Sequence, residues 1–501
     1  MRLAAVVAVA ALLAGALGCL PAVASPGESY EASVVALSVT YQAWDEDRPW
    51  ERTSPGSRRV NAVVVEGRYL LTTAQSIESA TLVQAEKFGR GKRVPAKVLY
   101  ADYEVDLALV QVEDPTFLND LVPVRLAPAS PLDGTLRSVR WRNQQLEVSA
   151  SRIKRFEVQE AYFGQLRHVF LLVQTDLSGG GWSEPVFTDG SLVGLTVSQD
   201  EQSARVIPVE ILSKYLARVR DGATYNGFAD LGVKWQVNED SAMARFLGQT
   251  GERSGILVRQ VPWGSTSYGV LEPRDLLLSL DGRTLDASGF YRHPRLGRLE
   301  FPQILADEHR IGDVVPAQVL RNGKPVDVRL TLRDYPAQMD LVPVRRGTSP
   351  PPYLVAGGLV FRELDADYLR SWGREWTKSA PIQLLSRYLL SRSAQEPGRR
   401  RIVFVQQVLP SAYNIGYQEI SSLPVERVNG RSVDSVAAVA EALRHPDGEF
   451  HVIEPLASRG ADLIVLDAAG LEEATREILE EYGIPQAARL AEPPPSGGSG
   501  D

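Results

Sequence analysis

Short runs of apolar and β-branched residues, separated by turn residues, recur along the first half of the chain. Such runs predict strands, and their regular spacing without long helices is typical of a β-barrel or a sandwich. A helical pattern follows at residues 207–220 and ends this segment, which we place at residues 30–223. The runs occupy residues 60–65, 68–72, 94–100, 107–112, 168–173 and 191–197.

The rest of the chain divides into two more globular segments, a linker and a tail. We place the segments at residues 227–346 and 353–485. Between them, residues 348–352 read Thr-Ser-Pro-Pro-Pro, a composition that favours a linker. Residues 486–501 end in Pro, Gly and Ser and cannot bury much apolar surface, so we expect a disordered tail.

The second and third segments share a weak internal repeat. The predicted strand at residues 255–261 resembles the one at residues 401–408. In each segment a later strand ends in a tight turn, at Asp281-Gly282 and at Asn429-Gly430. Both dipeptides favour two-residue hairpin turns because Asp, Asn and Gly tolerate positive φ. The repeat therefore predicts two related domains.

The first 24 residues have the pattern of an export signal. Arg2 gives a basic start, residues 3–24 carry no charge, and residues 22–24 read Ala-Val-Ala, which signal peptidase recognises. We predict a cleaved signal peptide at residues 1–24 and a periplasmic or secreted protein. Two alternatives stay open: an uncleaved membrane anchor, because about 20 apolar residues span a bilayer, and a lipoprotein modified at Cys19.

The amino-acid composition argues against several classes of function. Lys and Arg number 54 against 62 Asp and Glu, and this net charge of −8 argues against nucleic acid as a partner. A single cysteine excludes a disulfide framework and a cysteine-based zinc site. The five histidines form no pair at metal-binding spacing, so we expect no metal and no cofactor. They are His168, His293, His309, His445 and His451.

Four blocks in the first segment occur in an order that carries a family resemblance. They are residues 67–77, Asp106 to Val110 (D-L-A-L-V), residues 174–176 (Q-T-D) and residues 191–195. In this order they resemble the HtrA/Deg family of trypsin-fold serine proteases with PDZ domains. The resemblance covers nearly the whole chain after residue 24. It implies a mainly β fold, with a trypsin-like double β-barrel followed by two PDZ-like α+β domains.

The catalytic triad that the resemblance implies is incomplete. Asp106 matches the orienting carboxylate, but Gln75 stands where the family has its histidine. An amide cannot accept and return a proton near neutral pH, so the general base is missing. His168, the one histidine of this segment, lies in an apolar run and does not offer a substitute.

The block that matches the family's nucleophile loop is also altered. The spacing from Asp176 to Pro185 is two residues shorter than in the family pattern. Matching by residue type puts Ser183 at the nucleophile, whereas counting forward gives Glu184 and counting back from Pro185 gives Trp182. This shortening predicts a remodelled loop and the loss of the backbone N–H pair that forms an oxyanion hole.

The remaining segments resemble PDZ domains, which add an extended peptide as a strand and hold its carboxylate on the N–H groups of a Φ-Gly-Φ loop. Leu231, Gly232 and Val233 match that loop in the second segment. Residues 356–361 are the counterpart in the third segment, which is similar to the terminal PDZ-like unit of plant Deg proteases. That resemblance implies a role in assembly more than in substrate capture.

These features together predict an exported HtrA/Deg-like pseudoprotease. It would bind peptides or unfolded protein segments through its PDZ domains, as a scaffold, a chaperone or a regulator of active Deg relatives. The family implies a homo-oligomer built on trimers. Two alternatives stay open: an active serine endopeptidase in protein quality control that uses Ser183 with a substitute base, and a structural assembly protein with closed PDZ grooves.

Overall fold

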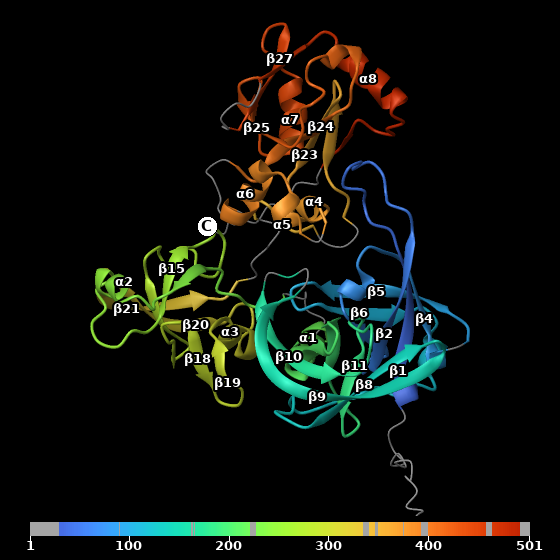
Figure 1. Ribbon diagram of the computed structural model, residues 1–501, viewed down its shortest axis with the longest axis vertical. Coiled ribbons are helices and arrows are strands. Elements are labelled where there is room, and N and C mark those ends of the chain that lie inside the picture. Colours follow the sequence, from blue (N-terminus) through green and yellow to red (C-terminus); the bar gives the residue numbers. More distant parts are fainter. Residues whose placement is uncertain are drawn as a thin grey trace, which may run out of the picture.

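Three units follow one another along the chain, and most of their regular structure is β-strand (Figure 1). The computed structural model describes residues 30–490 except 90, 162–163, 165, 221–226, 334–339, 346–348, 374, 392–398 and 457–462. The predicted signal peptide, residues 1–24, lies outside the described residues. Within the described part of the chain, no helix combines the length and apolar character needed to cross a membrane.

The first unit begins with six strands that close into a barrel in the order β1-β2-β3-β6-β5-β4. Alternate side chains of these strands point inward, and buried valines and leucines such as Val35, Leu37 and Val110 fill the interior. The strands are β1 (Val34–Tyr41), β2 (Gly56–Val65), β3 (Tyr69–Thr72), β4 (Ala80–Glu86), β5 (Val94–Asp102) and β6 (Leu107–Val112).

A second barrel follows in the same unit. Its sheet runs β11-β8-β9-β10-β13-β12, pairing of β11 with β12 closes it, and β7 (Arg125–Leu126) adds to β12. Helix α1 (Val209–Arg220) ends the unit and buries Ile211, Leu212 and Tyr215 in the core between the barrels. The strands are β8 (Thr135–Arg142), β9 (Gln145–Glu160), β10 (Arg167–Thr175), β11 (Pro185–Thr188), β12 (Ser191–Gln199) and β13 (Ser203–Pro208). The predicted double barrel is therefore confirmed.

The second unit is a sheet in the order β14-β15-β16-β20-β21, with β17 paired to β16. The predicted turn at Asp281-Gly282 is present, with φ of 50° and 70°. Helix α3 packs against the first unit, where the Val169 N–H donates to Gln303 Oε1 at 2.7 Å. The elements are β14 (Lys234–Val237), α2 (Ser241–Phe246), β15 (Ile256–Gln260), β16 (Leu276–Leu280), β17 (Arg283–Thr284), β18 (Phe290–His293), β19 (Gly297–Glu300), α3 (Pro302–Glu308), β20 (Val314–Arg321) and β21 (Lys324–Thr331).

The third unit is a sheet in the order β28-β27-β25-β24-β23-β22-β29, with β26 on β25. Because β29 pairs with β22, the fold continues past residue 485, and the tail predicted from residue 486 starts too early. Residues 491–501 lie outside the described residues. The elements are β22 (Tyr353–Ala356), β23 (Leu359–Glu363), α4 (Ala366–Arg370), α5 (Trp376–Ser379), α6 (Ile382–Ser391), β24 (Val403–Val408), β25 (Leu423–Val428), β26 (Arg431–Ser432), α7 (Val436–Leu443), β27 (Phe450–Pro455), β28 (Ile464–Asp467), α8 (Leu471–Glu481) and β29 (Ala488–Arg489).

The loop between β1 and β2, residues 42–55, joins the first unit to the third, and we call it the docking loop. Its Glu46 accepts two hydrogen bonds from the fully buried Arg362, on the backbone oxygen at 2.7 Å and on Oε2 at 2.9 Å. Arg345 also pairs with Glu46, and its Nε lies 3.0 Å from Asp365 Oδ2. Buried charges are tolerated only when paired, so this cluster ties the two units together.

Apolar packing completes the contact. Trp50 of the docking loop is 7% exposed and packs in one cluster with Tyr353, Val360 and Ile484 of the third unit. The Trp50 and Tyr353 rings meet edge to face, with centroids 5.9 Å apart. Arg489 Nη1 donates to the Pro49 carbonyl at 2.9 Å, so β29 also takes part.

Replacing Trp50 with Ala should loosen the third unit from the barrels, because a buried aromatic ring contributes about 3–5 kcal/mol to such packing. We expect faster amide hydrogen exchange both in residues 45–51 and in β22 and β23, measured by mass spectrometry. Trp372→Ala, which removes a 44% exposed indole of the same unit, is the matched control. Equal exchange in both variants would contradict this role of the docking loop.

Candidate active site

Asp106 keeps part of the geometry of a triad carboxylate. It directly precedes β6, and its Oδ1 accepts the Gln75 N–H at 2.7 Å and the Ala74 N–H as well. Among the described residues Oδ2, which would face an imidazole, has no hydrogen-bond partner. Burial, helped by the nearby charge of Asp102, raises the pKa of Asp106 to about 8. The group is therefore largely protonated at neutral pH and does not supply the negative charge that orients a catalytic histidine.

Gln75 is turned away from that free oxygen. It is the first residue of a short 3₁₀ helix, Gln75–Ile77, and its Nε2 donates to the Val197 carbonyl of β12. His168 does not replace the missing base, because it is fully buried in β10 beside Phe170. Burial lowers the pKa of His168 to about 4, which keeps the ring neutral.

Ser183, the nucleophile by residue type, lies inside the protein. Its side chain is 0% exposed, and its Oγ has no hydrogen-bond partner in the described residues. The Ser183 N–H donates to Thr196 O at 3.0 Å, and the Thr196 N–H donates to Glu184 O at 2.9 Å. These bonds fix Ser183 and Glu184 against β12 just before Pro185, and they leave Trp182, 42% exposed, as the outward residue.

The backbone donors of this loop are already in use. In trypsin-like sites the oxyanion is held by the N–H of the nucleophile and by that of the residue two positions earlier. Counted from Ser183 these are Ser183, which donates to Thr196, and Gly181, which donates to Glu184 Oε2 at 2.9 Å. The same oxygen accepts the Trp182 N–H at 3.0 Å. Glu184, which is buried and has a pKa raised by that burial, thus occupies the place of an anionic ligand.

The Φ-Gly-Φ loop of the second unit has the expected conformation. Gly232 has φ of 66°, and a Cβ there would lie 2.5 Å from Cβ of Ser265, so glycine is required. Ser267 Oγ donates to Leu231 O at 2.8 Å and holds the loop in place. Sequence reasoning missed Asp230, whose Oδ2 accepts the Gly232 N–H at 3.0 Å. The sequence offered one signal for this role, an acidic residue directly before the Φ-Gly-Φ motif.

The corresponding segment of the third unit is a hairpin. Residues 356–361 turn from β22 into β23, which pairs with β22 on one side and β24 on the other. The Gly357 N–H donates to Thr475 Oγ1 of α8 at 2.8 Å. With both edges of β23 paired, a peptide has no place to add beside this turn.

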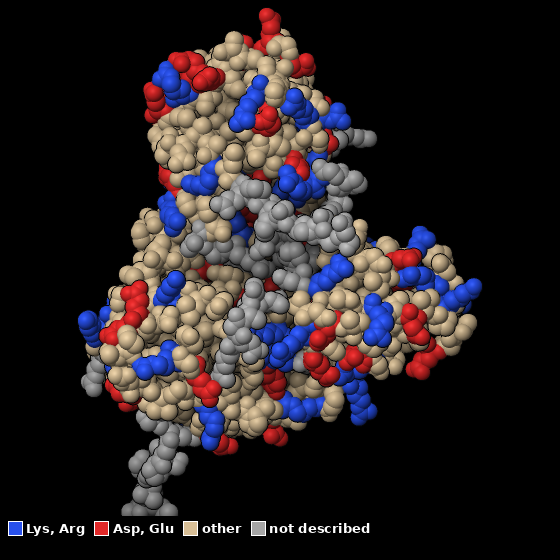
Figure 2. Space-filling view, turned by 180° about the vertical axis from the view of Figure 1, so that it is seen from behind, with Lys and Arg blue, Asp and Glu red and all other residues tan. Residues whose placement is uncertain are grey.

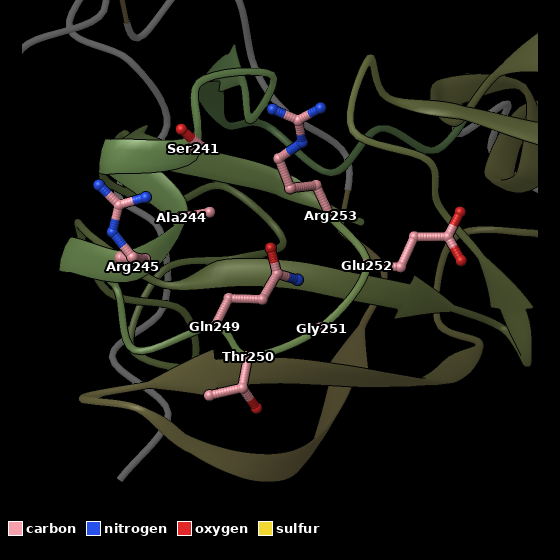
Figure 3. A pocket seen from close by; sticks show the side chains of 8 residues that line it. All are labelled: Ser241, Ala244, Arg245, Gln249, Thr250, Gly251, Glu252 and Arg253. Carbon is pink, nitrogen blue, oxygen red and sulfur yellow. The ribbon is translucent and has the colours of Figure 1, made fainter.

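Two surface features complete the description. A shallow pocket lies between α2 and the loop after it, but the side chains labelled in Figure 3 diverge and do not converge on a common point. On the face seen in Figure 2, basic and acidic side chains alternate without a continuous basic stripe. Within the described residues no three His, Cys, Asp or Glu side chains gather as a metal site needs. The pocket is lined by Ser241, Ala244, Arg245, Gln249, Thr250, Gly251, Glu252 and Arg253.

Comparison with known proteins agrees with the fold. Residues 60–195 match a trypsin-like peptidase domain, and residues 342–489 match a PDZ domain. Two trypsin-like barrels followed by PDZ-like units, together with these matches, show a trypsin-like peptidase domain joined to a PDZ domain, the arrangement that the resemblance to the HtrA/Deg family implies.

Individual relatives extend the similarity over most of the chain. It is 26% identical over 484 residues to protease Do-like 2, chloroplastic, of Arabidopsis thaliana, covering 93% of this chain and 77% of that protein. Protease Do-like 4, mitochondrial, of the same plant is 24% identical, covering 91% and 84%. Among solved structures, the HtrA-type protease AlgW with a decapeptide is 18% identical with a TM-score of 0.47, covering 61% of this chain and 96% of that one.

Asp106→Asn should make stability less dependent on pH. Because the pKa of Asp106 is raised from 3.8 to about 8, the folded state keeps a proton that the unfolded state loses between these two pH values. The stability that this proton contributes is fully present below about pH 4 and is lost as the pH rises towards 8. Relative to the parent, the variant should gain about 4 kcal/mol in unfolding free energy between pH 5 and pH 9, because about three pH units separate pH 5 from the folded pKa at about 1.4 kcal/mol each. Urea unfolding at both pH values measures this. A difference that stays constant with pH would contradict the buried, protonated state.

Glu184→Ala should destabilise the loop, because it leaves the buried N–H of Gly181 and the part-buried N–H of Trp182 without their acceptor. The expected loss is about 2 kcal/mol, in the range for unsatisfied buried donors. Glu184→Gln, which keeps an acceptor oxygen of the same size, should lose less than half as much. The urea midpoints of the two variants give the comparison. Equal losses would show that the N–H bonds do not hold the loop.

Proposed function

We propose that this chain is an exported pseudoprotease that binds peptides or unfolded protein segments. The observation that carries the proposal is the closed nucleophile loop: Glu184 fills the backbone donors while Ser183 lies buried. Hydrolysis needs an accessible hydroxyl, a base to deprotonate it and free donors for the oxyanion. No site within the described residues combines these three requirements.

Binding would be the task of the second unit. Its Φ-Gly-Φ loop leads into β14, which pairs with β15 on one side only among the described residues. A strand with one free edge accepts an extended peptide through main-chain hydrogen bonds. The protein would then act as a scaffold, a chaperone or a regulator of active Deg relatives, as a homo-oligomer based on trimers. The amino-terminal pattern supports the periplasm or the exterior as its location.

Labelling with a fluorophosphonate tests the loss of protease activity, because this probe reacts only with an activated serine. We expect no labelling and no cleavage of casein at trypsin-equivalent concentrations, with trypsin as the positive control. The competing function, an endopeptidase with a substitute base, predicts labelling that disappears in Ser183→Ala. That result would overturn the pseudoprotease assignment.

A further inference from the structure

The carboxylate loop of the second unit contains a carboxylate of its own. Asp230 Oδ2 accepts the Gly232 N–H at 3.0 Å. In a PDZ domain the backbone N–H groups of this loop hold the terminal carboxylate of the ligand. One donor of the Leu231-Gly232-Val233 loop is therefore in use before any peptide arrives.

We propose that Asp230 determines the ligand class of this unit, so that it takes internal, extended segments of unfolded chains and not free C-termini. The inference deepens the proposed peptide-binding function and rests on it. A terminal carboxylate has to displace Asp230 or share the loop with it, and two like charges at hydrogen-bonding distance repel each other strongly. A segment without a chain end avoids that repulsion.

The surroundings of Asp230 strengthen the competition. Glu104 of the first unit adds negative charge near it, and Lys234 at the start of β14 is the nearby cation. Burial raises the pKa of Asp230, with Glu104 as an additional cause, and this weakens the charge of Asp230 itself. The competition therefore rests first on the occupied Gly232 N–H, and the charge of Glu104 adds to it.

Strand addition does not depend on the loop donors. In β14 the side chains of Lys234, Gln236 and Val237 are exposed, and the strand has one free edge among the described residues. Main-chain hydrogen bonds along such an edge recognise any extended segment, whether or not it ends there. The occupied loop then disfavours ligands that end there in a free carboxylate.

The loop has supports other than Asp230, so its removal should leave the fold intact. Ser267 Oγ donates to Leu231 O at 2.8 Å, and Gly232 packs closely on Ser265. Leu231 is itself buried in the core of the second unit. An altered affinity in a variant would therefore report on the donors and not on unfolding, which circular dichroism can check.

The test uses the full chain and one fluorescein-labelled ten-residue peptide of alternating Val and Thr, made with a free carboxylate and with a C-terminal amide. Fluorescence anisotropy should show that the wild type binds the free acid no more tightly than the amide. Asp230→Ala should bind the free acid at least about tenfold more tightly than the amide. Asp230→Asn, which keeps an acceptor without charge, should fall between them.

Asp327→Ala is the matched control, since it removes one exposed negative charge of the same unit at a distance from the loop and should behave as wild type. A wild type that prefers the free acid tenfold, or an Asp230→Ala variant with no gained preference, would overturn the role of Asp230. Absence of binding to both peptides in both proteins would overturn the peptide-binding function itself.

Discussion

Buried or turn-bound backbone N–H groups must find an acceptor, and at three loops of this chain a carboxylate of the chain itself supplies it. Glu184 satisfies Gly181 and Trp182, Asp230 satisfies Gly232, and Asp106 satisfies Gln75. In a protease with PDZ domains, the first two groups of donors are the ones that receive an oxyanion and a peptide terminus. Carboxylates of the chain itself therefore occupy backbone donors at both loops.

The docking loop adds a second constraint on the same scaffold. Hydrogen bonds from Arg362, Gln406 and Arg489 fix its backbone on the third unit, and Trp50 fills the apolar part of the contact. In the third unit the turn that corresponds to a carboxylate loop is closed by β24 and α8. The third unit therefore anchors the docking loop, and the second unit is the one whose loop strand, β14, keeps an unpaired edge among the described residues.

The fold was largely predictable, because strand runs and turn pairs are local signals. The Asn429-Gly430 turn, with φ of 50° and 71°, follows from residue type alone. The site was predictable only in part. Gln75 in place of histidine is visible in the sequence, but the burial of Ser183 depends on its pairing with Thr196, a partner 13 residues away in the chain. The roles of Glu184 and Asp230 depend on which N–H groups their side chains meet, which residue spacing does not encode.

Amide hydrogen exchange at Gly181, Trp182 and Gly232 is the decisive measurement, because it reports whether each N–H is bonded in solution. Selective ¹⁵N labelling of glycine and tryptophan resolves these positions in the intact protein. We expect exchange slowed at least about 100-fold relative to an unstructured peptide, with protection lost at Gly181 and Trp182 in Glu184→Ala and at Gly232 in Asp230→Ala. Exchange at the unstructured rate in the wild type would contradict this expectation.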